Sequence, residues 1–327
     1  MKTRLLLKLA LLGGALALLQ LVFGAATNYK DTPTPVRLCD QYLAERRDII
    51  YFGESTVFTV DPEDKNKSPI DDMLQQLLPE YRLGSIAHDA FHLQLYEDFC
   101  TYIARKPYHP RLLIVPVNLA TVSPYWDDRP EYQFERIALF LRHDTWWFRA
   151  FYRPLAAFGA FNLNPVSQKA FDNVIVYDEG RPVGRMKDFT DDRYMNVTEE
   201  NMRDQLIVRY MHQITPEDLK MQALCRIADI PPHTDMEVLF YVTPVDYETG
   251  DKYLGARFSA HIRESVRLVK RLLAEKGITP LDLSLDLSAD KFHWGSRYPN
   301  EHLNERGRRY VAEQLAAAVR QRLGPPS

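Results

Sequence analysis

The stretch Asp48-Ile49-Ile50-Tyr51-Phe52-Gly53-Glu54-Ser55 decides how this chain of 327 residues is expected to fold. Its apolar, β-branched run over residues 48–52 is typical of a strand in the middle of a sheet, with both faces buried. The glycine and the polar residues after it end the strand. We therefore expect Ser55 to leave the strand on a tight turn that lifts its hydroxyl clear of the sheet edge.

Strand patterns and helix patterns alternate along the rest of the chain. Further strands are predicted over apolar runs at residues 112–117, 237–242 and 281–287. Helices are predicted from capping residues and helical spacing at residues 68–78, 88–104, 259–276 and 304–323. This alternation implies a mostly parallel sheet in a three-layer α/β/α arrangement, where ligands bind outside the carboxyl ends of the strands. Ser55, Asn118 and Thr243 each follow a predicted strand, so we expect them at that edge.

The alternation is interrupted over residues 123–231, which we interpret as an insertion into an α/β domain of residues 48–327. The insertion is rich in aromatic residues and then polar over residues 178–201, and we expect it to cover part of the carboxyl edge of the sheet. Large aromatic side chains are most often buried, so a local core is the favoured interpretation. A surface that faces a membrane or stacks on sugars is the alternative.

The N-terminus carries a targeting pattern. Lys2, Arg4 and Lys8 precede an apolar run over residues 9–26, and a polar linker over residues 27–47 leads into the domain. Residues 1–26 match both a signal peptide and a membrane anchor of ~20 residues. In either case we expect the body of the protein to be exported, secreted after cleavage or anchored outside the cytoplasm, with the basic end on the cytoplasmic side.

Composition argues against several classes of protein. The formal net charge of -3 does not favour nucleic acid as a partner. The chain has no glycine-rich phosphate-binding loop, so neither a nucleotide nor another cofactor is expected. Cys39, Cys100 and Cys225 are too scattered for a zinc cluster; buried thiols are favoured, with one disulfide as the alternative. His88 and His92 share a helical face but lack the metalloprotease glutamate, so no metal is expected.

A histidine far downstream offers a base for the serine. His302 stands in Glu301-His302-Leu303-Asn304, directly ahead of the last predicted helix. A serine hydroxyl is a weak nucleophile until an adjacent base takes its proton, and the two partners meet in space rather than along the chain. The Gly-x-Ser-x-Gly elbow of α/β-hydrolases is absent, which argues against that serine-enzyme fold.

Several short blocks resemble the SGNH/GDSL hydrolase superfamily. Gly53-Glu54-Ser55 resembles its Gly-Asp-Ser nucleophile block, and Pro116-Val117-Asn118 resembles the block that supplies its asparagine. His302-Leu303-Asn304 with Gly307 resembles the closing block, and Gly84 falls where the glycine block is expected. The match spans residues 48–327 in the right order, interrupted by the insertion.

The resemblance implies a flavodoxin-like α/β/α fold and a serine esterase or O-acyltransferase. In such an enzyme, Ser55 would attack an acyl carbonyl, and His302 would remove and later return the proton of the serine hydroxyl. The Ser55 and Gly84 N–H groups and the Asn118 amide hold the oxyanion. The N-terminal apolar segment also resembles that of proteins that move acyl groups onto cell-envelope polymers, so an acyl ester or acylated polysaccharide is the implied partner. The alternative is a non-catalytic relative that binds polysaccharide or assists envelope assembly.

This chain departs from the family pattern at two positions where the family has an aspartate. The family usually places an aspartate three residues before the histidine, where this chain has Pro299. Glu301, Asn300 and Asp290 are candidates for orienting the imidazole, and a backbone carbonyl is another. Glu54 stands in place of the family's aspartate, and we expect it to support the serine from beneath rather than to act as the acid.

Three residues ahead of the histidine are candidates for substrate binding. His293, Trp294 and Arg297 combine aromatic and guanidinium groups, which suit sugars and anions. Ordinary loop packing is the equal alternative.

Overall fold

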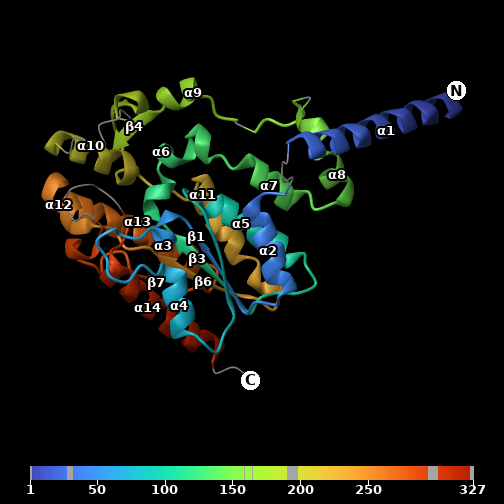
Figure 1. Ribbon diagram of the computed structural model, residues 1–327. Coiled ribbons are helices and arrows are strands. Elements are labelled where there is room, and N and C mark those ends of the chain that lie inside the picture. Colours follow the sequence, from blue (N-terminus) through green and yellow to red (C-terminus); the bar gives the residue numbers. More distant parts are fainter. Residues whose placement is uncertain are drawn as a thin grey trace.

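A parallel sheet forms the centre of the protein (Figure 1). The computed structural model describes residues 2–27, 32–157, 159–163, 165–189, 198–293 and 301–324. Within them, five parallel strands follow the order β2-β1-β3-β6-β7. They are β1 (Ile49–Gly53), β2 (Leu83–Ala87), β3 (Leu112–Val117), β6 (Glu237–Val242) and β7 (Leu281–Asp282). This is the strand order of one kind of doubly wound α/β fold, so the prediction of an α/β protein with a mostly parallel sheet is confirmed.

Helices pack on both faces of the sheet because successive side chains of a strand point to opposite sides. In β1, Ile50 and Phe52 enter one hydrophobic core, while Ile49 and Tyr51 enter the other. The first core is covered by α2 (Thr34–Ala44), α5 (Leu93–Ala104), α11 (Leu219–Ala228) and α13 (Arg257–Ala274). The second is covered by α4 (Ile70–Leu77) and α14 (Glu305–Leu323). The carboxyl ends of the strands are thereby left to loops.

Several elements differ from the sequence predictions, among them helix α2, which lies within the predicted linker of residues 27–47. Strand β2 was not predicted, because its sequence Leu-Gly-Ser-Ile-Ala lacks a continuous apolar run. The strand predicted over residues 281–287 ends at Asp282. The helix predicted over residues 88–104 begins only at Leu93, because residues 88–92 form the turn out of β2 and Ala90 has a left-handed backbone with φ 59°.

The predicted insertion contains most of the remaining elements. Directly after η1 (Leu119–Val122), it begins with α6 (Pro124–Asp127) and η2 (Pro130–Tyr132), followed by α7 (Glu135–Arg142), α8 (Trp146–Ala157), α9 (Gln168–Asp172), β4 (Ile175–Asp178), β5 (Arg181–Arg185), η3 (Met186–Asp188) and α10 (Glu199–Tyr210). Its boundary at residue 231 was placed too late, because α11 packs against α5 and α13 in the helix layer. Three further short helices follow, η5 (Pro231–His233), α12 (Tyr247–Leu254) and η6 (Ala289–Lys291).

Part of the aromatic insertion forms a local core. Phe148 and Tyr152 are buried, and Tyr152 packs 4.7 Å from Phe140 and stacks on Phe161 at 5.4 Å between ring centroids. The favoured interpretation holds for these rings. Trp147 is an exception, with 52% of its surface exposed.

The N-terminal helix α1 (Lys2–Thr27) projects outward from the rest of the fold and contacts it at α8 (Figure 1). Its stretch Thr3–Val22 is long and apolar enough to cross a membrane, with a mean hydropathy of 2.2 and none of its most apolar window buried. A signal peptide near the N-terminus has the same properties, so both interpretations of this segment stand.

The three cysteines are unpaired thiols. Cys39 and Cys100 are buried, and Cys225 is half-buried. Burial raises the pKa of Cys39 and Cys100, which disfavours their thiolate forms. The favoured interpretation of buried thiols is confirmed for these two, and the alternative of one disulfide is not observed.

Candidate active site

Ser55 and His302 meet at the carboxyl edge of the sheet. Ser55 is the first residue of α3 (Ser55–Phe58), directly beyond the end of β1. The Nε2 atom of His302 lies 2.9 Å from Ser55 Oγ, although 247 residues separate the two along the chain. A hydroxyl and an imidazole at hydrogen-bond distance have the geometry of a nucleophile and its base.

The turn that presents Ser55 requires a glycine. A Cβ on Gly53 would lie 2.4 Å from Val57 Cγ2, so only glycine lets α3 fold back this closely over the strand end. The turn is closed by two backbone hydrogen bonds, from Val57 N–H to Glu54 O at 3.1 Å and from Thr59 N–H to Ser55 O at 2.9 Å. The expected tight turn after β1 is present.

The segment that carries His302 is tied down on both sides. His293 N–H donates to His302 O at 2.7 Å, beside an antiparallel bridge between Phe292 and Leu303. Asn304 caps α14, and its Oδ1 accepts hydrogen bonds from the N–H groups of the first turn at 3.1 and 3.3 Å, as predicted from the sequence. Backbone and cap together hold the imidazole in place.

A buried carboxyl lies beneath the serine. Glu54 is 2% exposed and accepts hydrogen bonds from Thr56 Oγ1 at 2.6 Å, Asn118 Nδ2 at 3.2 Å and Tyr96 OH at 3.3 Å. Burial raises the pKa of Glu54 to about 7, opposed by the hydrogen bonds from Thr56 and Asn118 and reinforced by the charge of Glu301. Glu54 therefore braces Asn118 next to the serine and makes no hydrogen bond to His302 among the described residues.

Asn118 follows β3, at the same edge of the sheet as Ser55. Its Oδ1 accepts the N–H of Ala120 at 3.0 Å, and its amide nitrogen donates to Glu54. Both ends of the side chain are thus fixed. An amide nitrogen carries two hydrogens, so one remains after the bond to Glu54.

Gly84 does not lie where the sequence resemblance placed it. It pairs with Ile50 inside β2, away from the carboxyl edge, so its assignment as an oxyanion donor is wrong. The glycine has a packing role instead, because a Cβ there would lie 2.6 Å from Tyr42 Cδ2. The turn at that edge is formed by Asp89 and Ala90, whose N–H groups donate no hydrogen bond to any other described residue.

The structure places the candidates for orienting the His302 imidazole in different surroundings. Pro299 and Asn300 lie outside the described residues. Asp290 is wrong as an orienting group, because its carboxylate binds Ser288, Lys291 and Arg306 beside the start of α14 rather than His302.

Glu301 is buried beside the imidazole. It is 6% exposed, and its Oε2 accepts a hydrogen bond from Tyr210 OH at 3.4 Å. Burial lowers the pKa of His302, whereas the charge of Glu301 opposes that shift. Among the candidates that the structure describes, Glu301 is therefore the one whose charge acts on the histidine.

His293 packs inside the protein instead of facing substrate. It is 3% exposed, and its Nδ1 lies 2.6 Å from Asp61 Oδ2. Its assignment to substrate binding is therefore wrong, and the loop-packing alternative is observed. Trp294 and Arg297 lie outside the described residues.

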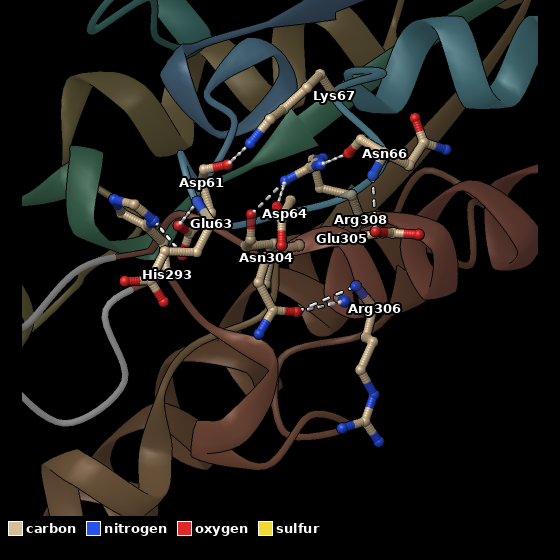
Figure 2. Close-up of polar contacts among 12 residues, drawn as sticks. Asp61, Glu63, Asp64, Asn66, Lys67, His293, Asn304, Glu305, Arg306 and Arg308 are labelled. Carbon is tan, nitrogen blue, oxygen red and sulfur yellow. Dashed lines mark hydrogen bonds and ion pairs between the residues drawn. The ribbon is translucent and has the colours of Figure 1, made fainter.

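Arg308 joins the loop after the serine to the histidine segment, a role that the sequence did not indicate (Figure 2). Its side chain is fully buried and donates to Asp64 Oδ2 at 2.7 Å, Asn66 O at 2.8 Å and Ser68 O at 3.1 Å. The same guanidinium donates to Leu303 O at 3.0 Å. In the sequence, this arginine is one of several charges in the last helix and resembles a surface residue.

The insertion also contributes a charge near the site. Arg209, at the end of α10, is 7% exposed, and its guanidinium lies 5.8 Å from the ring centroid of Tyr125 and 5.9 Å from that of Trp126. Its positive charge lowers the pKa of His302, in addition to the larger effect of burial. Neither the spacing of Arg209 nor the residues beside it in the sequence predicted that it would lie near the site.

Among the described residues, no group of three or more His, Cys, Asp or Glu side chains is placed to hold a metal ion. No protein-family model matches the chain, and a search of curated proteins gives no significant relative.

Proposed function

We propose that this protein is an exported serine esterase or O-acyltransferase of the SGNH/GDSL kind, with Ser55 as nucleophile and His302 as base. The observation that carries the proposal is the 2.9 Å contact between His302 Nε2 and Ser55 Oγ. Its setting agrees with this chemistry, because the serine follows the interior strand β1 of a parallel sheet, where ligands of such folds bind.

The reaction would proceed in two halves. Ser55 Oγ bonds to the acyl carbonyl carbon while its proton passes to His302 Nε2. The tetrahedral intermediate then expels the alcohol, which takes that proton, and the acyl group remains on Ser55. Water attacks the acyl-serine in hydrolysis, and a sugar hydroxyl attacks it in transfer. In either case His302 removes the proton of the incoming group, the bond between Ser55 Oγ and the acyl carbon breaks, and the proton returns to Ser55 Oγ.

Two features of the site support this role. Burial lowers the pKa of His302, so the imidazole is neutral, and able to accept a proton, near pH 7. For the oxyanion, we infer donors in the N–H of Ser55, the remaining amide hydrogen of Asn118 and the backbone at Asp89 and Ala90. A single donor of this kind is worth ~3 kcal/mol in the transition state.

The proposed substrate is an acyl ester, of a cell-envelope or exopolysaccharide sugar. Support comes from the apolar helix α1, which suits a protein whose body is exported. A second candidate function is a non-catalytic protein that keeps the fold and binds polysaccharide or an envelope-assembly partner. The observation that favours it is Pro299, where the resemblance implies an aspartate.

One experiment separates these functions. The full chain in detergent is offered a chromogenic acetyl ester and, separately, a fluorophosphonate that labels activated serines. We expect turnover and labelling in the wild type and in Ser167→Ala, a control whose serine caps α9 in the insertion. Both signals should disappear in Ser55→Ala. A wild-type chain that is folded yet gives neither signal would favour the binding role, and equal rates in Ser55→Ala would remove Ser55 as nucleophile.

A further inference from the structure

Helix α8 of the insertion packs against α1 (Figure 1). Most of α1 is exposed; Leu5, Leu9 and Leu18, for example, have between 56% and 63% of their surface open. Half-buried positions occur at Gly13 and Leu16, and again at residues 19–20, spacings that place them along one side of the helix. The apolar helix α1 therefore has one packed side, and α8 is the neighbour against which it packs.

Helix α8 is firmly attached to the body of the protein on its other sides. Phe148 and Tyr152 are buried in the aromatic core of the insertion. Arg149 turns toward α2, where its guanidinium lies 3.6 Å from Asp40, and it also lies 2.6 Å from Asp144 in the segment just before α8. The position of α8 relative to the domain is thus defined by apolar and charged contacts.

One side of α8 carries an apolar stripe. Trp147, Phe151 and Leu155 follow each other at intervals of one helical turn, so they lie along one side of the helix. Trp147 is 52% exposed, and Phe151 and Leu155 are half-buried. Tryptophan and phenylalanine beside a membrane-spanning helix are typical of side chains at the boundary between lipid headgroups and acyl chains.

The part of α1 that contacts α8 indicates how deep α8 would lie in a membrane spanned by α1. The half-buried positions of α1 run over residues 13–20, within the apolar run of residues 9–26 that follows Lys8. A helix rises ~1.5 Å per residue, so residue 20 lies roughly 9 Å from the outer end of that run, inside the outer half of a bilayer core of ~30 Å. Because Arg4 and Lys8 belong on the cytoplasmic side, the end of the contact at residues 19–20 lies in the outer leaflet.

We propose that α8 is a second membrane-contact element, which lies beside α1 in the outer leaflet with the Trp147-Phe151-Leu155 stripe against phospholipid. The inference rests on α1 remaining attached as an anchor, which is one part of the proposed function and is independent of catalysis. Two contacts, α1 and α8, would restrict how the α/β domain turns relative to the membrane surface.

The experiment uses the full chain reconstituted in phosphatidylcholine vesicles that carry bromine on the upper acyl carbons, where bromine quenches nearby tryptophan fluorescence. The chain has four tryptophans, so single replacements identify the quenched one. We expect quenching in the wild type, a clear loss of the quenched fraction in Trp147→Phe, and no such loss in the control Trp126→Phe.

Three results would overturn the proposal. Equal quenched fractions in the wild type and Trp147→Phe would place Trp147 in water. Covalent cross-linking of two chains through a cysteine at position 147 (W147C), together with no quenching, would assign the stripe to a second copy. An N-terminal sequence of the membrane-isolated chain that starts beyond α1 would remove the anchor; this outcome leaves the Ser55 esterase test unaffected.

Discussion

The imidazole of His302 lies 2.9 Å from the hydroxyl of Ser55, and the segments that carry these two residues are joined a second time by Arg308. Its guanidinium bonds Asp64 in the loop after the serine and the carbonyl of Leu303, the residue after the histidine. Rates of catalysis fall steeply when reacting groups are displaced by about 1 Å. A rigid connection between the two segments is therefore expected to matter for the proposed activity.

The dependence of esterase activity on pH should reflect the burial of His302. Burial lowers the pKa of this imidazole from its ordinary 6.5, and only the neutral form accepts a proton from Ser55. We therefore expect the acid limb of kcat/KM to fall below pH 6.5, measured with an ester whose own charge does not change in that range. An acid limb above pH 6.5 would contradict the assignment of His302 as a buried base.

Asn118→Ala should reduce kcat by about 10²-fold or more, with a smaller effect on KM, because an oxyanion donor acts mainly in the transition state. The matched control is Thr243→Val, a buried position that also follows a strand at the carboxyl edge. Thermal unfolding of both variants shows how much stability each loses. Equal kcat in the two variants would remove Asn118 from the oxyanion site.

Arg308→Lys should lower both stability and kcat. A lysine keeps the charge but cannot reach Asp64, Asn66, Ser68 and Leu303 together, so buried oxygen atoms lose their partners, at a cost of about 3 kcal/mol. Chemical denaturation measures this cost, and kinetics on the folded protein measure positioning.

The control for Arg308 is its neighbour Arg309. Arg309 pairs with Glu305 on the surface at 3.5 Å, so Arg309→Lys should change stability by no more than about 0.5 kcal/mol. If Arg308→Lys unfolds more easily while kcat of the folded enzyme is unchanged, the arginine stabilises the fold without positioning the histidine.

Glu54→Gln should make the protein less sensitive to pH. Burial raises the Glu54 pKa from 4.5 to about 7, so the folded state favours the protonated carboxyl. The stabilisation of the folded state by the protonated Glu54 carboxyl is fully present below about pH 4.5. It is lost as the pH rises through about 7, a change of roughly 3 kcal/mol in the free energy of unfolding. Denaturation of the wild type at pH 5 and pH 8 measures this loss.

Glu54→Gln keeps the shape of the side chain without the charge, so its free energy of unfolding should change much less over that range. Glu275→Gln, on the surface beyond α13, is the control and should behave like the wild type. A slope in Glu54→Gln as steep as in the wild type would assign the pH dependence to another group.

Local patterns predicted much of the fold. The apolar runs at residues 112–117 and 237–242 became β3 and β6, and Asn304 caps the last helix, because burial preference and capping act over a few neighbouring residues. The contact between Ser55 and His302 was expected because their blocks resemble the nucleophile block and the closing block of the SGNH/GDSL superfamily. Strand β2 was missed, since its short sequence forms a strand only through pairing with β1.

The sequence by itself determined the alternation of strands and helices, the apolar N-terminal segment, and the serine and histidine that stand at the ends of their elements. Only the tertiary structure decided what surrounds them. Gly84 lies inside strand β2 and packs against Tyr42, and His293 lies against Asp61. Arg308 is buried between two loops. These contacts join residues far apart in the chain, and their energies depend on burial and distance, which no local pattern encodes.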